Sequence, residues 1–497
     1  MIEKQIVGGS KRSNRPERQR ALVLQGGGAL GAYEVGAIKG LYETLTQGQA
    51  KNDSGKDSKA PLFDIIAGSS IGAMNAAVLI GNIQKGKSWE GAITELEKFW
   101  TEGIALKKGP DRINDDIPPE DNFSMYPWWE PWTEEFRNWG PDRKKIISFA
   151  SKEAARRYYS TKVFVSEAGK VFSLKDIRDD NKFFDPMAKR IILNEEPLKK
   201  LIEDFGKFPI GTCIDKGEPR LLVTAVDVSE GITVTFDSYK KSDGKRKTVY
   251  RPGEKYRHKK NSKYFDRKED DSNHILIEYD EGIQIDHIMA SGTLPDFYDP
   301  KEICKRSFWD GGILSNTPLK ELLEAHRDYW VNVENQCEAP DLEVYVVNVH
   351  PSTIDVANIP KHFDEVKDRN NDIVYGDRTY NDQYSASLVT DYIDFIRRLK
   401  DIAKSHIKDL TNREAFENEL ESLELEPAAS TTYTSGEPRS FKDLMTGRFK
   451  LLKVQRIEHK YDPETSTSFK GGDTTLQTIQ DLIKQGYDDV MALECNG

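Results

Sequence analysis

The sequence has few cysteines and no long apolar run, and these absences narrow the class of protein. Its four cysteines are too scattered across 497 residues to form a disulfide framework or a metal-binding cluster. No stretch of about 18 consecutive apolar residues occurs, so a transmembrane helix is not expected. The charged first twenty residues also lack the apolar segment of a Sec signal peptide. We therefore expect a cytoplasmic or peripheral membrane protein.

An excess of positive charge is also missing. The chain has 72 Lys and Arg against 83 Asp and Glu, which gives a formal net charge of -11. This balance gives no reason to expect nucleic acid as a partner, and it disfavours general attachment to anionic lipid. Only a local basic patch would then allow electrostatic attachment to anionic lipid.

The hydrophobic pattern predicts two strand–turn–helix units near the start of the chain. An apolar run at 21–25 precedes three glycines and a helical pattern at 29–45. A second run at 63–68 precedes a helix rich in small residues at 70–81. Such units in succession favour an α/β layered fold with a mainly parallel sheet. Further along the chain, the pattern predicts a hairpin at 221–238, strands at 342–350 and 449–459, and a closing helix at 473–493.

Ser70 is the candidate nucleophile. The segment GSSIG (68–72) fits the G-x-S-x-G pattern, in which the serine occupies a sharp turn between a strand and a helix. Gly68 and Gly72 would allow the two backbones to approach closely at this turn. The unpaired N–H groups at the start of the helix favour negative charge on a reacting group. A tight turn with two solvated serines is the alternative interpretation.

The glycines Gly26, Gly27 and Gly28 form the second candidate element. GGGALG (26–31) also matches the dinucleotide-binding pattern, but the second strand ends without the acidic residue that this pattern requires. The other interpretation is an oxyanion hole, in which the N–H groups of Gly27 and Gly28 bind the developing oxyanion. A tight turn without a catalytic role also remains possible.

Asp310 is the third candidate residue. It is predicted to end a strand and is followed by Gly311 and Gly312 in WDGGILSNTP (309–318), which would leave its carboxylate open on one side. An aspartate before glycines is otherwise usually a turn residue. Two histidines, His326 and His350, follow it in the order that a Ser–Asp–His triad would require. His350 lies at the end of a predicted strand and is the better candidate for a triad.

The three segments together resemble the patatin-like phospholipase family. The resemblance rests on GGGALGAYEVG, GSSIGAMNAA and ASGTLP followed by DGG, and it covers roughly residues 20–350. It implies a dyad of Ser70 and Asp310 with an oxyanion hole at Gly26, Gly27 and Gly28. Many family members carry Arg or Lys where this chain has Leu30, so a charge at that position is not expected to contribute.

The resemblance also implies a fold, while composition divides the chain, which becomes more charged from about residue 360. The expected fold is a three-layer α/β/α sandwich around a mostly parallel mixed sheet. We expect a flexible leader (1–18), a catalytic domain (19–355) with a helical insertion (about 85–210), and an α+β C-terminal extension (356–497).

The implied function is hydrolysis of fatty-acyl esters of membrane lipids, without a metal or other cofactor. The partners are a lipid substrate and, transiently, a membrane or micelle surface. Two alternatives remain open: a carboxylesterase or thioesterase that uses the same residues, and a lipid-binding protein that has kept the fold without activity.

Two further segments have functional and ordinary interpretations. The aromatic cluster at 125–139 would serve as a lid or interfacial anchor, or it packs as an ordinary insertion. The basic loop at 239–269 is a solvated loop, or it contacts anionic headgroups.

Overall fold

The computed structural model describes residues 15–52, 61–105, 193–250, 274–295, 297–361, 363–431, 438–461 and 470–495. The aromatic cluster at 125–139 lies outside these residues, as do most of the predicted leader and most of the basic loop. Within the described part of the chain, no helix is long and apolar enough to cross a membrane.

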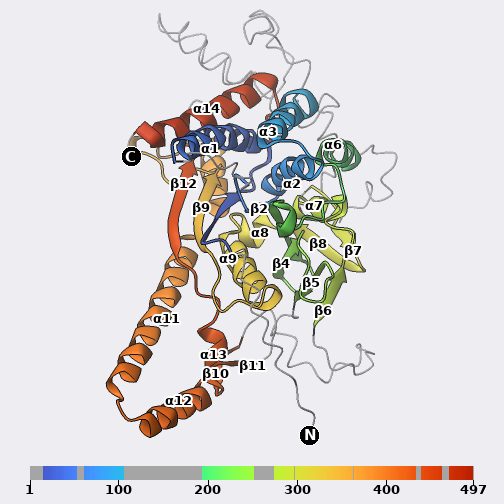
Figure 1. Cartoon of the computed structure of the whole chain (residues 1–497). Helices are drawn as coiled ribbons and strands as arrows, with labels where there is room; N and C mark the ends of the chain where they lie inside the picture. Colours follow the sequence, from blue (N-terminus) through green and yellow to red (C-terminus); the bar gives the residue numbers. More distant parts are fainter. Residues whose placement is uncertain are drawn as a thin grey trace, which may run out of the picture.

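An eight-stranded sheet forms the centre of the described structure (Figure 1). Seven strands follow one another across it, and the eighth, β4, pairs with β3. From one edge to the other, the strands are β12 (Leu451–Glu458), β9 (Asp341–Asn348), β1 (Arg18–Leu24), β2 (Ile65–Ser69), β3 (Arg220–Asp227), β8 (Arg306–Asp310) and β7 (Lys301–Ile303), with β4 (Ile232–Asp237) beside β3.

The sheet is mixed, and its parallel part contains the two predicted strand–turn–helix units. β12, β9, β1, β2 and β3 run parallel to one another. β8 pairs antiparallel with β3, and β7 pairs antiparallel with β8. β2 and β8 lie on either side of β3 and run in opposite directions. A site that combines the residue after β2 with the end of β8 therefore requires these two ends to lie close to each other across β3.

Helices cover both faces of the sheet, which explains why its central strands are apolar on both sides. In β1, Leu22 and Leu24 belong to one buried cluster, while Ala21 and Val23 belong to another. The first cluster includes side chains of α1 (Gly31–Asn52), α2 (Ile71–Gln84), α3 (Trp89–Lys98) and α14 (Leu476–Cys495). The second includes side chains of α9 (Leu319–Asp328). The predicted α/β/α sandwich is therefore confirmed.

Two elements from the predicted C-terminal extension are part of these layers. β12 pairs with β9 along seven residues of the sheet. α14 lies against α1, where Tyr33 Oη donates a hydrogen bond to Asp489 Oδ2 at 2.9 Å. The domain boundary near residue 355 remains a prediction, but the central sheet includes strands from both sides of it.

The other described elements lie around this sandwich. Two consecutive helices, α11 (Tyr380–His406) and α12 (Leu410–Glu424), extend away from the sheet in Figure 1 and meet at a wide angle. Two small antiparallel sheets are formed by β5 (Lys247–Tyr250) with β6 (Ile275–Glu278), and by β10 (Pro427–Thr431) with β11 (Pro438–Ser440). The remaining helices are α6 (Glu196–Gly206), α7 (Ile285–Ser291), α8 (Gly312–Ser315), α10 (Phe363–Tyr375) and α13 (Phe441–Leu444). Short helical turns span Gly28–Leu30 (η1), Phe99–Ile104 (η2), Ile214–Lys216 (η5), Tyr329–Val333 (η7), Val356–Asn358 (η8) and Lys470–Gly472 (η9).

Candidate active site

Ser70 occupies a strained turn between β2 and α2. Its φ of 54° and ψ of -124° lie in a region that residues other than glycine rarely adopt. This conformation allows the chain to turn from the strand directly into the helix, with Ser70 as the residue that precedes α2. The geometry is that of a nucleophile elbow, in which the serine hydroxyl projects at the N-terminus of a helix.

Gly68 and Gly72 allow the close approach that this turn requires. A β-carbon at Gly68 would overlap the backbone of Gly72. A β-carbon at Gly72 would lie 2.5 Å from the carbonyl oxygen of Leu24, in the neighbouring strand β1. The sequence pattern therefore places glycine at the two points where the backbones of strand and helix meet.

Asp310 lies within direct hydrogen-bonding distance of Ser70. The Ser70 hydroxyl donates to Asp310 Oδ2 at 2.7 Å. The other carboxyl oxygen, Oδ1, accepts from the backbone N–H of Gly312 at 2.7 Å. Gly311 lies between them as the residue before α8, and its N–H donates to the carbonyl of Ser291 at 3.3 Å. These bonds fix the carboxyl group with one oxygen directed at the serine.

Burial raises the pKa of Asp310 to about 7. The side chain is fully buried, and removal from water disfavours its charged form. The hydrogen bonds from Ser70 and Gly312 act in the opposite direction but do not cancel this effect. A carboxyl group with a pKa near neutrality is a stronger base than an ordinary aspartate, which suits the removal of a proton from a hydroxyl.

Two of the three predicted oxyanion-hole amides are available. The N–H of Gly26 donates to the carbonyl of Asn316 at 3.1 Å, so it already has an acceptor. Among the described residues, the N–H groups of Gly27 and Gly28 have none. Gly26 lies next to the nucleophile, because a β-carbon on it would lie 2.9 Å from the β-carbon of Ser70. The two unpaired N–H groups therefore belong to the glycines that directly follow the one in contact with the serine.

A turn from the C-terminal part of the chain covers this glycine loop. Gly28 has a φ of 58°, and a β-carbon there would overlap the carbonyl oxygen of Gly471 in η9. Lys470, in the same turn, contacts Asp372 Oδ1 at 2.8 Å and Asp368 Oδ1 at 3.0 Å. Both aspartates lie on α10 and are almost fully buried. This group of three charged residues fixes the turn above the glycines.

His350 pairs with Asp372 rather than with the dyad. Its Nδ1 lies 3.0 Å from Asp372 Oδ1, and its backbone N–H donates to Gln25 Oε1 at 3.0 Å. Asp310 accepts the hydrogen bond of the Ser70 hydroxyl directly, and in a triad a histidine imidazole would accept that bond instead. His326 is fully buried, and its Nε2 lies 2.9 Å from the carbonyl oxygen of Pro340. The structure thus gives the triad alternative no support.

Sequence reasoning did not single out three residues that support the site. Ser291 Oγ accepts a hydrogen bond from the N–H of Ser70 at 2.9 Å. Asn316 donates both to the carbonyl of Gly26 at 3.0 Å and to that of Tyr375 at 2.7 Å. Gln25 donates to the same Tyr375 carbonyl at 3.1 Å. Ser291 and Asn316 lie within the quoted ASGTLP and WDGGILSNTP segments, which was the available signal.

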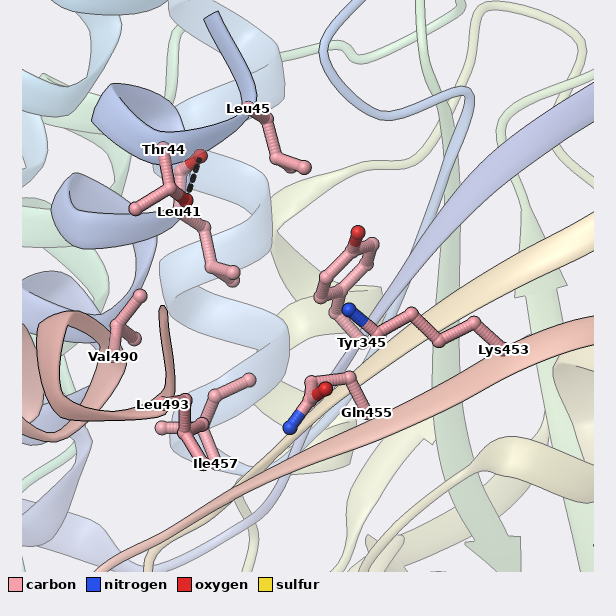
Figure 2. Close-up of a pocket in the computed structure, with 9 residues that line it drawn as sticks. All are labelled: Leu41, Thr44, Leu45, Tyr345, Lys453, Gln455, Ile457, Val490 and Leu493. Carbon is pink, nitrogen blue, oxygen red and sulfur yellow. Dashed lines mark hydrogen bonds between the residues drawn. The ribbon is translucent and has the colours of Figure 1, made fainter. Parts of the chain in front are cut away.

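A pocket of about 290 Å³ lies away from this site (Figure 2). It is lined by Leu41, Thr44, Leu45, Tyr345, Lys453, Gln455, Ile457, Val490 and Leu493. Leu41 and Leu45 are 10 and 14 residues beyond Gly31, the first residue of α1, so they lie roughly 15–20 Å along the helix from its start beside the glycine loop. The pocket contains neither member of the dyad and is not the candidate site.

Comparisons with known proteins identify the family of this chain. A search of curated proteins found no match. Among solved structures, VipD from Legionella pneumophila is 14% identical over 96% of this chain and 67% of that chain, with a TM-score of 0.28, which is too low to support an argument. The family model for patatin-like phospholipase matches residues 22–323, which is more than half of the chain and includes Ser70 and Asp310. The chain therefore belongs to the patatin-like phospholipase family.

Proposed function

We propose that this protein is a serine lipid acyl hydrolase of the phospholipase A or lysophospholipase type, with Ser70 and Asp310 as its catalytic dyad. The observation that carries the proposal is the 2.7 Å hydrogen bond from Ser70 Oγ to Asp310 Oδ2. Family membership supports lipid acyl hydrolysis in general. The contact between a strained serine and a buried carboxylate supports the specific chemistry.

The reaction proceeds in two acyl-transfer steps. Asp310 takes the proton from Ser70 as the Ser70 oxygen forms a bond to the ester carbonyl carbon. The N–H groups of Gly27 and Gly28 bind the resulting oxyanion. The same proton passes from Asp310 to the leaving alcohol as the ester bond breaks, which leaves an acyl-enzyme. Water then attacks this intermediate, gives a proton to Asp310, and releases the fatty acid while the proton returns to Ser70.

Asp310 and the oxyanion-hole donors both contribute to the proposed rate enhancement. A carboxylate with a pKa near 7 is still a weak base for a serine hydroxyl, so it cannot supply the whole rate enhancement. Removing one oxyanion-hole donor costs about 2.7–4 kcal/mol of transition-state stabilisation in known enzymes. The two glycine amides and the N-terminus of α2 are therefore expected to contribute as much as the base.

The test is fatty-acid release from mixed micelles of phospholipid or lysophospholipid. We expect Ser70→Ala and Asp310→Asn each to lower the rate by at least about 10³-fold, because each removes one half of the proton-transfer pair. Ser69→Ala is the matched control. Its hydroxyl is buried and has no hydrogen-bond partner among the described residues, so its loss should leave the rate nearly unchanged.

Three outcomes would revise the proposal. Retention of activity in both dyad variants would show that other residues carry the reaction. A loss of several orders of magnitude in His350→Ala would favour a triad. Cleavage of short-chain esters or thioesters, but of no lipid, would favour the carboxylesterase or thioesterase alternative.

A further inference from the structure

Helix α11 exposes a regular apolar row on its outer side. Its inner side is attached to the rest of the molecule, since Ile393 is buried and Thr390 donates to the carbonyl of Phe449 at 2.7 Å. Figure 1 shows α11 at the margin of the molecule, extending from the sheet toward α12. Alternating steps of four and three residues connect the row, which is formed by Leu388, Tyr392, Phe395, Leu399 and Ile402.

This spacing is the heptad pattern of a helix that packs against another helix. All five side chains are exposed, and Tyr392 and Phe395 at its centre are 60% and 58% exposed. Aromatic and aliphatic side chains in a continuous row of this length carry a cost in water that a partner would remove. The two edges of the row differ in character and indicate which partner that is.

One edge of the row is apolar and the other is charged. Val389 and Ile396 lie along one edge, seven residues apart, and both are exposed. Asp391 and Arg398 lie along the other edge, also seven residues apart and exposed. Two residues separated by seven occupy nearly the same side of a helix, two turns apart.

We propose that α11 pairs with α11 of a second copy of this chain, antiparallel, around a two-fold axis. In that arrangement each edge of one helix meets the same edge of the other. Asp391 of each copy then faces Arg398 of its partner, and Val389 faces Ile396. In the row itself, Tyr392 lies against Phe395 and Leu388 against Leu399.

The pairs share one centre, as a two-fold axis requires. The midpoint of Leu388 and Leu399 coincides with that of Tyr392 and Phe395, between Ile393 and Asp394. The midpoints of the two edge pairs lie within one residue of this point. A parallel pairing would instead place Asp391 and Arg398 against the apolar edge and bury both charges without partners, which is costly.

The charges also distinguish a second copy from a lipid surface. α11 carries four acidic residues (Asp382, Asp391, Asp394 and Asp401) and four basic ones (Arg397, Arg398, Lys400 and Lys404), so its formal net charge is zero with histidine neutral. It therefore has no electrostatic attraction to anionic headgroups. A bilayer would in addition leave Asp391 without an opposite charge.

The experiment measures the molar mass of the full chain by light scattering after size exclusion, at up to about 100 µM, where interfaces of modest size are occupied. We expect twice the chain mass of 56.6 kDa. Asp391→Arg alone and Arg398→Asp alone each place like charges opposite one another twice, and should give monomers. The double variant Asp391→Arg with Arg398→Asp restores both opposite-charge pairs and should give a dimer again.

The most specific test of the proposal is the molar mass of a mixture of the two single variants. One copy then carries two positive charges on this edge and the other two negative ones, so a heterodimer should form from two monomeric proteins. The control is Leu425→Gln, an exposed apolar residue beyond α12 that is outside the row, and it should remain a dimer.

Three results would overturn the proposal. These are a monomeric wild-type chain at the highest concentration, a dimer that neither single variant weakens, and failure of the mixed variants to associate. If the wild type is monomeric but binds uncharged phosphatidylcholine vesicles, and Phe395→Gln abolishes that binding, the row is a lipid contact instead.

Discussion

The carboxyl group of Asp310 is fully buried, and its burial affects both catalysis and folding. Its pKa of about 7 means that near neutral pH the group is divided between its protonated and charged forms. Only the charged form can accept the proton of Ser70. At the same time, the folded state has to hold a charge away from water, which costs free energy whenever the group ionises.

The raised pKa predicts the pH dependence of the reaction. The base is active when deprotonated, so kcat/KM should rise with pH, reach half of its limiting value near pH 7, and level off above it. A monomeric ester substrate should be used, so that pH effects on lipid aggregates do not contribute. A profile that stays flat from about pH 5 to 8 would contradict Asp310 as the base.

The same shift predicts that the proposed base destabilises the fold at alkaline pH. The folded-state pKa of about 7 lies above the ordinary value of 3.8, so the folded state binds this proton more tightly than the unfolded state. The contribution of Asp310 to the free energy of unfolding therefore falls as pH rises from about 4 to about 7. The upper limit of this decrease in the free energy of unfolding is roughly 4 kcal/mol, at about 1.4 kcal/mol for each pKa unit.

Asp310→Asn should accordingly be more stable than the wild type at pH 8, by about 1–3 kcal/mol. An asparagine keeps the acceptor for the Gly312 N–H but carries no charge. Urea denaturation of both proteins at pH 5 and pH 8 measures the difference, which should be smaller at pH 5. An equal difference at both pH values would mean that ionisation of Asp310 is not its source.

The proximity of Ser70 and Asp310 could be expected from the family resemblance, while the residues that support them could not be predicted. Ser70 and the glycines each lie in a short pattern at the end of an apolar run, but an aspartate before glycines is usually a turn residue, so only the combination of the three segments singled out Asp310. Ser291 and Asn316 act through hydrogen bonds to residues 221 and 290 positions away. Contacts of that range depend on the order of strands in the sheet, which no local pattern determines.

At the scale of elements, the turn η9 connects the C-terminal part of the chain to the glycine loop. Burial acts to raise the pKa of Asp372, but hydrogen bonds from His350 and Lys470 bring it below its ordinary value. Asp372 is therefore charged in the folded protein and depends on Lys470 for compensation. A buried carboxylate that loses its cation is strongly destabilising.

Lys470→Met should lower the free energy of unfolding by about 3 kcal/mol, because it leaves Asp368 and Asp372 without this cation. It should also lower kcat by roughly tenfold with little change in KM, since displacement of the turn would loosen the oxyanion donors. Denaturant titration and steady-state kinetics measure the two effects.

Two variants serve as controls for Lys470→Met. Lys484→Met removes an exposed ion pair with Asp488, and a surface pair of this kind contributes little to stability. Lys470→Arg keeps the charge and should recover part of both losses. If kcat is unchanged in Lys470→Met while stability falls, the turn does not position the glycine loop.

Periodicity predicted the type of most elements, and most of their ends differ by one to three residues, although α1 continues to Asn52, seven residues beyond its predicted end. The strand expected at 63–68 is Ile65–Ser69, and the one expected at 449–459 is Leu451–Glu458. The pairing of β12 with β9 was not predicted. A change in composition after residue 360 indicated an extension, but composition does not reveal which sheet edge a distant strand will join.

At the scale of the whole molecule, the C-terminal elements complete the sandwich. β12 covers the edge of β9, and α14 covers α1, whose inner residues are fully buried. A chain that ends after residue 447 would expose a parallel strand edge and an apolar helix face. We expect it to be insoluble or rapidly degraded by proteases.

The matched control for this truncation ends after residue 495, which keeps both β12 and α14. The soluble fraction after expression and the rate of limited proteolysis measure the outcome. A soluble, protease-resistant chain that lacks residues beyond 447 would show that the sheet is stable without its last strand.

The position of η9 over the glycine loop also has a consequence for synthesis on the ribosome. Gly28 emerges from the exit tunnel early, but the turn that begins at Lys470 follows it by more than 440 residues (28 to 470). Domains tend to fold as they emerge, from the N-terminus onward. In the nascent chain, Ser70 and Asp310 therefore emerge long before the glycine loop is covered, and the geometry of the candidate site is completed only after Lys470 has emerged.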